Sequence, residues 1–480
     1  MIPFSNSYIK LPEHFYQRVE PAIVPSPALI AVNDELAREL GIDPEWLRSD
    51  AGLAVLAGNK IAAGSEPLAQ AYAGHQFGGF SPRLGDGRAA LLGEVIDKNG
   101  KQKDIQLKGS GRTPFSRSGD GKSALGPVIR EYLMSEAMHA LGVPTTRALA
   151  AVATGEKVIR EEPTDGGIFT RVASSHLRVG TFQYFAARND TEAVKTLIDF
   201  ALNRHFPDAV ISHSPALTLL QQVISAQAKL VAHWMSIGFI HGVMNTDNSS
   251  ISGETIDYGP CAFMDDFHPN CVFSAIDRDA RYAWGNQAPI AHWNLTRLAE
   301  TLLPLLDPDK DAAMKIAETA LDAYSEQFIA LYHRHFKAKL ALTDDAPIEF
   351  IQETLSLLAD QQVDYTLFFR RLTQLANKET GTSKLADLFL DSEACLDWAE
   401  TWRTHLDGDK ILAMQQINPI IIPRNHQVEA AIQLAYKGDY TLFHRLHEAW
   451  KAPFSENPDH AYLELAPLPD ERVTQTFCGT

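Results

Sequence analysis

The 480-residue sequence predicts an α+β fold with two lobes: a small lobe rich in strands that contains one main helix, and a large helical lobe. Strand-like runs and turn residues concentrate in the first part of the chain, whereas after about residue 190 apolar residues recur at helical spacing. We therefore expect an N-terminal extension followed by the small lobe over 1–185, and a helical lobe with a C-terminal tail over 186–480.

A hairpin is the clearest element of the small lobe. Its first strand is predicted over 89–96 and its return strand over 104–108, and an Asn-Gly turn separates them. Asn-Gly between two strand-like runs is a strong hairpin signal. Because side chains alternate along a strand, Lys108 should point away from Ile105 and Leu107.

Glycine-rich loops flank this hairpin. Irregular structure and short helices are expected over 1–65, followed by a glycine-dense stretch over 72–88. A second glycine-rich loop over 109–122 leads to Ser123, which we expect to cap a helix that runs to about Leu141. Two further strand-like segments complete a small sheet, at 147–153 and 167–172.

The helical lobe begins with a long amphipathic helix that Gly238 ends. Its apolar face is formed by Leu217, Leu220, Ile224, Val231 and Met235. Later helices are expected over 292–306, 311–332 and 348–359. The proline-rich tail from Pro453 is expected to be an extended wrap or a flexible end.

Composition excludes several classes of protein. Lys and Arg total 43 against 60 Asp and Glu, and this net charge of -17 argues against nucleic acid as a general partner. No run approaches the ~18 apolar residues of a membrane span, and no secretory signal is visible. Four cysteines make no disulfide framework, so we expect a cytoplasmic protein with mostly reduced thiols. Cys478, third from the end, is available for redox chemistry.

The local charge differs from the total. Nine basic and five acidic residues lie between Ser81 and Lys122, a net of +4. Glycines let backbone N–H groups approach an anion, and Arg binds phosphate in bidentate fashion, so this region is a candidate phosphate site. Arg171 and Arg178 add two more cations. Gly121-Lys122-Ser123 is not a P-loop, because the glycine required five places earlier is a serine.

One segment has the order of the protein-kinase signature, in which an Asn lies seven places after a His and Asp-Phe-Gly follows. Here Asn248 lies seven places after His241, and Asp257 begins an Asp-Tyr-Gly motif. Asn and Asp supply the oxygen ligands that hold magnesium against phosphates. The place of the kinase catalytic Asp is taken by Val243, which cannot accept a proton. Asp247 is the nearest substitute carboxylate.

The residues that precede this segment in the chain also follow the kinase order. A kinase needs a glycine loop, a strand lysine and a helix glutamate that orients the lysine. Lys108 ends a predicted strand, and the next helix offers Glu131 and Glu136. The order of these parts predicts a protein-kinase-like fold.

The cysteines and histidines give weaker signals. His268 and Cys271 have the spacing of two metal ligands, but a structural zinc site needs about four, so we do not interpret them as one. Cys261 is expected to be buried. Cys271 and Cys478 could pair, which would tie the tail to the segment after the metal site.

These motifs together resemble the selenoprotein O family, also called YdiU, whose members are protein adenylyltransferases with a protein-kinase-like fold. The resemblance is carried by the runs 72–88, 107–125, 128–147 and 239–259. Some members have selenocysteine at the place of Cys478. The resemblance implies that ATP is inverted relative to ordinary kinases, so that AMP moves to a protein hydroxyl.

The resemblance also implies the site residues. The catalytic base would be Asp247, and the metal ligands Asn248 and Asp257. The helix glutamate would be Glu131 rather than Glu136. The nucleotide contacts, which include Glu131 and Asp257, would further be Gly85, Gly87, Arg88, Lys108, Asp120, Gly121, Arg171 and Arg178.

The implied reaction uses ATP with Mg²⁺ or Mn²⁺ and modifies Ser, Thr or Tyr of protein substrates, with the chain itself as a further candidate substrate. Asp247 could activate the hydroxyl or mainly stabilise the metal shell. Two alternatives stay open: an ordinary phosphotransferase with an unusual base, and an inactive pseudokinase that binds nucleotide as a scaffold. Lys108, Asn248 and Asp257 together argue against the scaffold.

Overall fold

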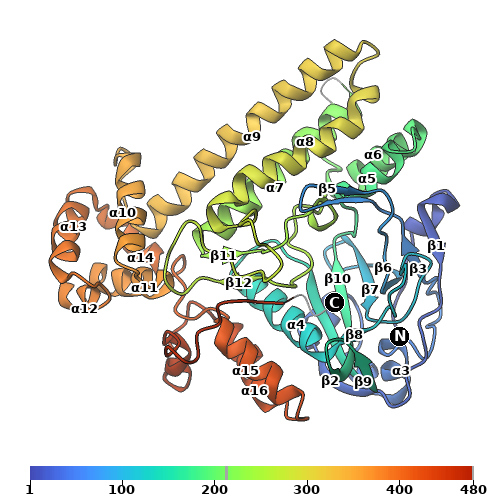
Figure 1. The fold of residues 1–480 in the computed structure, drawn as a ribbon, viewed down its shortest axis with the longest axis horizontal. Coiled ribbons are helices and arrows are strands. Elements are labelled where there is room, and N and C mark those ends of the chain that lie inside the picture. Colours follow the sequence, from blue (N-terminus) through green and yellow to red (C-terminus); the bar gives the residue numbers. More distant parts are fainter. Residues whose placement is uncertain (211–213, 478–480) are drawn as a thin grey trace.

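The structure is a computed structural model that describes residues 1–210 and 214–477. It is a mixed fold of one main sheet and many helices (Figure 1). Within the described residues the main sheet has eight strands, all paired antiparallel, in the order β1-β3-β6-β7-β10-β9-β2 with β8 beside β10. These strands are β1 (Tyr16–Arg18), β2 (Ala28–Val32), β3 (Leu68–Gln70), β6 (Ala89–Ile96), β7 (Gln102–Lys108), β8 (Ser123–Ala124), β9 (Arg147–Ile159) and β10 (Pro163–Ala173).

The predicted hairpin is confirmed as β6 and β7. Its turn is closed by Asp97, whose carboxylate accepts hydrogen bonds from the backbone N–H groups of Asn99 and Lys101. Ile105 and Leu107 are buried in the apolar core, and Lys108 lies on the other face of the strand, as the alternation predicts.

Two predictions for the small lobe need correction. The first 65 residues contain the expected short helices but also contribute β1 and β2 to the sheet, and these short strands acquire their conformation from their partners β3 and β9. Ser123 does not cap the helix, because it pairs with Gly167 in β8. Helix α4 (Leu125–Ala140) starts without a side-chain cap, and the Tyr436 hydroxyl instead accepts a hydrogen bond from the Gly126 N–H at 3.0 Å.

The long predicted helices are confirmed with wider bounds. They are α7 (Pro215–Ser236), α8 (Gln287–Leu306), α9 (Lys310–Lys339) and α10 (Ile348–Asp360). The other helices are α1 (Asp34–Glu39), α2 (Pro44–Arg48), α3 (Asp50–Leu56), α5 (Val179–Ala186), α6 (Thr191–His205), α11 (Tyr365–Ala376), α12 (Thr382–Ala386), α13 (Ser392–His405), α14 (Ile411–Met414), α15 (Asn425–Ala435) and α16 (Thr441–Trp450). Among the residues described, none of these helices combines the length and apolarity needed to cross a membrane.

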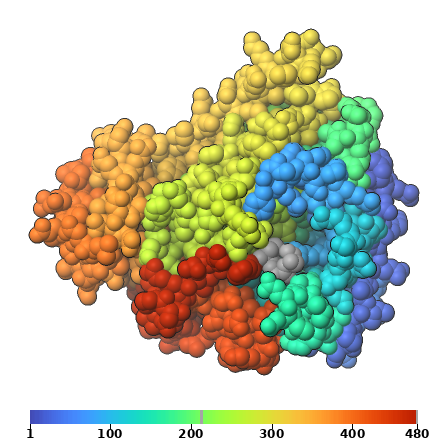
Figure 2. All heavy atoms as spheres, in the orientation of Figure 1, coloured from blue at the N-terminus to red at the C-terminus, as the bar shows by residue number. Residues whose placement is uncertain are grey.

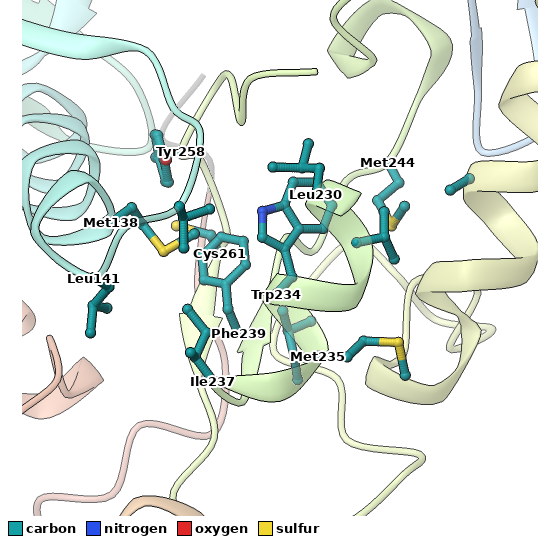
Figure 3. Close-up of a cluster of buried hydrophobic side chains, with 14 of the residues drawn as sticks. Met138, Leu141, Leu230, Trp234, Met235, Ile237, Phe239, Met244, Tyr258 and Cys261 are labelled. Atoms are coloured by element: carbon teal, nitrogen blue, oxygen red, sulfur yellow. The ribbon is translucent and has the colours of Figure 1, made fainter. Parts of the chain in front are cut away.

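A buried apolar cluster joins the sheet's main helix to the helical part of the chain. Figure 3 shows side chains of α4, α7 and the two-residue strand β11 (Phe239–Ile240) meeting around the Trp234 indole. Tyr258 and Cys261, which follow in the chain, lie in the same cluster, so the predicted burial of Cys261 is confirmed. The cluster therefore fixes α4 relative to the segment 239–261.

The C-terminal part packs against both regions. Helices α15 and α16 lie beside α4 (Figure 1), where Arg130 pairs with Glu429 at 3.1 Å. The described tail is only partly the extended wrap that was predicted, because Pro458–Glu464 forms a 3₁₀ helix. Beyond it the tail is held against the segment 266–273: Thr476 donates its backbone N–H to the Phe273 carbonyl at 2.7 Å, and Arg472 pairs with Asp266. Cys478 lies outside the described residues, and its pairing with Cys271 stays a prediction.

Lys339, at the end of α9, is a buried cation. Its side chain lies against aromatic rings, with Nζ 4.0 Å from the centre of the Phe369 ring, and no carboxylate pairs with it among the residues the structure describes. Burial lowers the pKa of Lys339 from 10.5 to about 7. Between these values the unfolded chain binds a proton that the folded chain does not, so stability should rise with pH across this window.

Replacing Lys339 with Met is accordingly expected to stabilise the protein at pH 7 by about 2–4 kcal/mol, since one pKa unit corresponds to about 1.4 kcal/mol. Urea unfolding at pH 7 and pH 9.5 measures this, and the variant should lose the rise in stability with pH. Lys315→Met, at an exposed position of the same helix, is the matched control and should change stability by less than ~0.5 kcal/mol. A Lys339→Met protein less stable than the control at pH 7 would contradict the argument.

Candidate active site

Three cations and two carboxylates meet where β7, β10 and α4 approach the segment after β11. Lys108 Nζ, at the end of β7, donates to Glu131 of α4 at 2.6 Å and to Asp257 Oδ1 at 2.6 Å. Arg171 of β10 donates from Nη1 to the same Asp257 oxygen at 2.7 Å and lies 3.2 Å from Glu131. Arg178, just before α5, donates from Nη1 to Asp257 Oδ2 at 2.8 Å. We call these five residues the Asp257 cluster.

The cluster keeps Asp257 ionised. Burial alone would raise the pKa of Asp257, but the charges of Arg171, Lys108 and Arg178 bring this pKa well below its ordinary value. The Asp257 backbone has a φ of 64°, in the left-handed region that aspartate tolerates better than most residues. Such a conformation is commonest at functional sites, where the surrounding contacts hold it in place.

Asp247 has the opposite environment. It lies in the 3₁₀ turn Thr246–Asn248, only 8% exposed. Its Oδ2 accepts a hydrogen bond from the Gln76 amide at 3.1 Å, and its Oδ1 is buried without a partner. Burial raises the pKa of Asp247 to about 6. Two carboxylates whose environments move their pKa values apart are typical of acid and base residues with different roles.

Asn248 and Asp257 provide oxygen donors of the kind that Mg²⁺ and Mn²⁺ prefer. The Asn248 amide N–H is fixed by the Val243 carbonyl at 3.0 Å, so its orientation is set by the backbone. Among the described residues, no group of three or more His, Cys, Asp or Glu side chains could hold a metal ion. The donors fit a magnesium-type ion that completes its shell with phosphate oxygens and water.

Comparison with known proteins identifies the family of the chain. The family model described as protein adenylyltransferase SelO matches residues 1–451. The chain belongs to the SelO family. Among its relatives, the protein nucleotidyltransferase YdiU of Rhodopseudomonas palustris (strain BisB5) is 55% identical over 489 residues, which cover 100% of this chain and 99% of the relative. The YdiU proteins of Nitrobacter hamburgensis and Rhizobium johnstonii are 54% and 52% identical, again over 100% of this chain and over 96% and 97% of the relatives. The resemblance inferred from the motifs is thus confirmed.

The helix glutamate can also be distinguished in this SelO protein. Glu131 contacts Lys108, whereas Glu136 binds Arg147 through two hydrogen bonds of 2.8 Å and accepts the Ala148 N–H. Glu136 therefore has a structural role in joining α4 to β9.

The two glycine-rich loops pack against each other beside the Asp257 cluster. A Cβ on Gly85 would lie 2.3 Å from the Phe115 ring, and Gly87 approaches the backbone of the same loop. Arg88 is half-exposed and has no ion pair among the described residues. Asp120, next to Gly121, pairs with Arg160 at 3.0 Å and not with the cluster. The structure thus brings Lys108, Glu131, Arg171, Arg178 and Asp257 into contact and leaves the glycine loops outside that contact.

Sequence reasoning missed three residues of the site. Gln106 accepts a hydrogen bond from Arg171 Nη2 at 2.7 Å and donates to Asp86 at 3.3 Å. The Tyr72 ring lies 4.7 Å from the Arg178 guanidinium carbon. Gln76 contacts Asp247. Gln106 could have been found, because strand alternation already placed it on the same face as Lys108; Tyr72 and Gln76 lie in a stretch that suggested only a loop.

A cavity of about 600 Å³ lies beside this site. The hairpin formed by β4 (Gly74–Gln76) and β5 (Gly79–Ser81) contributes Phe77 to its wall, and most of the remainder comes from the segment 276–290. Figure 2 shows the blue hairpin region against the yellow-green segment. Asn245 joins the two walls, since its Oδ1 accepts hydrogen bonds from the Phe77 N–H at 3.0 Å and from the Tyr282 hydroxyl at 2.7 Å. The cavity is therefore close to the Asp247 turn.

Proposed function

We propose that the protein transfers AMP from ATP to Ser, Thr or Tyr hydroxyls of other proteins and releases pyrophosphate. Membership of the SelO protein adenylyltransferase family supports this reaction class. The observation that carries it is the convergence of Lys108, Arg171 and Arg178 on a single carboxylate. A pyrophosphate leaving group needs more compensating positive charge than one phosphate, and preorganised cations supply it without reorganisation.

Asp247 would take the proton of the acceptor hydroxyl. The hydroxyl oxygen forms a bond to the α-phosphorus, the bond from that phosphorus to the bridging oxygen breaks, and pyrophosphate leaves. A base whose pKa is about 6 is largely ionised at pH 7 and still basic enough to accept a proton, which supports this role for Asp247. Arg178 would hold the turn in place, since it also donates to the Asp247 backbone carbonyl at 2.6 Å.

Asn248 and Asp257 would hold the Mg²⁺ or Mn²⁺. When bound, the ion neutralises phosphate charge. Its entry would require Asp257 to release part of its contacts with Lys108, Arg171 and Arg178, whose side chains would then be free to contact the nucleotide phosphates. Gly85, Gly87, Arg88, Asp120 and Gly121 would form the remaining nucleotide contacts on the rim.

The overall arrangement we propose is the two-lobed protein-kinase-like fold, with the N-terminal extension and small lobe over 1–185 and the helical lobe over 186–480. Its support is the order of the parts: strand lysine, helix glutamate, Asn248 and the Asp-Tyr-Gly motif. We further propose a cytoplasmic location, protein substrates with accessible hydroxyls, and the chain itself as one of them.

Parallel incubations with α-labelled and γ-labelled ATP test this proposal, with bacterial lysate proteins and the chain itself as acceptors. We expect label on protein from the α position and none from the γ position, and intact mass should show a gain of AMP on any self-modified chain. Label from γ alone would identify an ordinary phosphotransferase, and no label from either would favour a nucleotide-binding scaffold. Either result would overturn adenylyl transfer.

A further inference from the structure

The β4–β5 hairpin lies directly on the turn that carries Asp247. The His75 N–H donates to the Thr246 hydroxyl at 2.7 Å, and the Phe77 N–H donates to Asn245. Gly74 has no room for a side chain, because a Cβ there would lie 2.4 Å from Asp247 Oδ1. A segment about 170 residues earlier in the chain therefore covers the carboxylate.

The hairpin is itself held in place from a third element. The Gln183 amide of α5 lies 2.8 Å from His75 Nδ1, and its carbonyl oxygen accepts from the Thr246 hydroxyl at 2.6 Å. The His75 ring also packs edge-on against Trp293 of α8, with 5.2 Å between ring centres. Side chains that lock one another in this way position a functional group more accurately than a free loop does.

Gln76 makes the decisive contact. Its Nε2 donates to Asp247 Oδ2 at 3.1 Å, and among the described residues no other side chain donates to that carboxylate. The other carboxylate oxygen lies against Gly74 without a partner. Among the described residues, Gln76 thus makes the one side-chain hydrogen bond that fixes how the Asp247 carboxylate is rotated.

We propose that Gln76 is a positioning residue for AMP transfer: its amide holds Oδ2 of Asp247 and thereby orients the carboxylate toward the acceptor hydroxyl. This inference rests on the proposed function, in which Asp247 is the base. Gln76 itself touches neither nucleotide nor acceptor in this scheme.

The test measures kcat and the KM for ATP, with α-labelled ATP and a fixed lysate protein mixture, together with the melting temperature. Gln76→Ala is expected to lower kcat about 10- to 100-fold. The KM for ATP and the melting temperature should stay close to those of wild type. Gln76→Glu keeps the size of the side chain but replaces the hydrogen-bond donor with a like charge beside Asp247, so its kcat should fall at least as far.

Gln433→Ala is the matched control, because it removes a similar amide–carboxylate hydrogen bond, to Glu429 at 3.0 Å on α15, away from the site. It should match wild type. If Gln76→Ala and Gln76→Glu leave kcat unchanged, or lower it only together with a raised KM and a lower melting temperature, Gln76 is merely structural and the inference is wrong.

Asp247→Asn separates this failure from that of the proposed function. If Asp247→Asn keeps the kcat of wild type, Asp247 is not the base, and the proposed role of Asp247 fails together with the inference. If Asp247→Asn lowers kcat but Gln76→Ala lowers it by the same factor with and without Asp247→Asn, Gln76 does not act through Asp247 and only the positioning role is overturned. A wild-type protein that transfers no AMP would overturn both.

Discussion

Replacing Asp257 with Asn is expected to reduce AMP transfer by on the order of 10³-fold while leaving ATP binding in the absence of metal intact. Asn keeps the shape of the side chain but removes the charge that gathers Lys108, Arg171 and Arg178 and that would bind the metal. Phosphates carry negative charge of their own, so the three freed cations can still attract the nucleotide.

The Asp257→Asn variant should also differ from wild type in its melting temperature, both without nucleotide and with ATP. Without the Asp257 charge, Glu131 is left as the only carboxylate of the cluster beside three cations, so the nucleotide-free protein should melt at a lower temperature than wild type. ATP with EDTA should then raise the melting temperature of the variant more than that of wild type, because the phosphates replace the missing charge.

Asp344→Asn is the control, since Asp344 is exposed and far along the chain, where it pairs with Lys410. It should match wild type in transfer and in the ATP response. Full transfer activity in Asp257→Asn, or an ATP response no larger than that of wild type, would exclude the proposed role of the cluster.

Local patterns in the sequence were sufficient for the elements that depend on local physics. The β6–β7 hairpin follows from an Asn-Gly turn closed by its own aspartate, and α7 from its apolar stripe. Strands β1 and β2 could not be predicted, because they have three and five residues and pair with strands that lie 50 or more residues away. The prediction that Ser123 caps α4 was wrong for a similar reason: Tyr436, which is distant in the chain, accepts the hydrogen bond that a cap at Ser123 was expected to accept.

Among the site residues too, those that stand in a local motif could be predicted and those that depend on a distant contact could not. Lys108, Asp257 and Glu131 could be predicted because each stands in a motif with a fixed order, and the structure brings them into contact. Gln76 could not, because its importance comes from a contact across 171 residues with Asp247. The distinction between Glu131 and Glu136 needed the family resemblance, since both lie on one helix and only packing assigns each a partner.

A second buried ion cluster should have the largest effect on stability. Arg204 of α6 donates to Glu94 of β6 at 2.6 Å and pairs with Asp104 of β7. Glu94 also accepts the Ser7 N–H at 3.0 Å, and Asp104 accepts the His176 N–H at 2.9 Å. Arg204 therefore joins the N-terminal extension, the hairpin and the helical part of the chain at a single point.

Arg204→Met is expected to destabilise the protein by about 3–5 kcal/mol at pH 7, because it leaves two buried carboxylates without their cation. Burial favours the protonated form of Asp104, but Arg204 and His176 bring its pKa below the ordinary value. That contribution is present above the unfolded pKa of about 4 and is lost as pH falls. In the variant the contacts of His176 remain but the opposing charge of Arg204 is gone, so Asp104 should protonate more easily and the two stability curves should converge toward acidic pH.

Urea unfolding at pH 7 and pH 4.5 measures this difference, and the triple variant Arg204→Met, Glu94→Gln, Asp104→Asn should recover part of the loss at pH 7. Arg18→Met removes an exposed pair with Glu66 at 3.5 Å and should cost less than ~1 kcal/mol. Equal losses in the two single variants would mean that Arg204 does not hold these elements together.

Strand β7 carries both Asp104 and Lys108. If the Arg204→Met protein still folds, it should also bind ATP more weakly than wild type, because the contact that fixes the strand at Asp104 is gone.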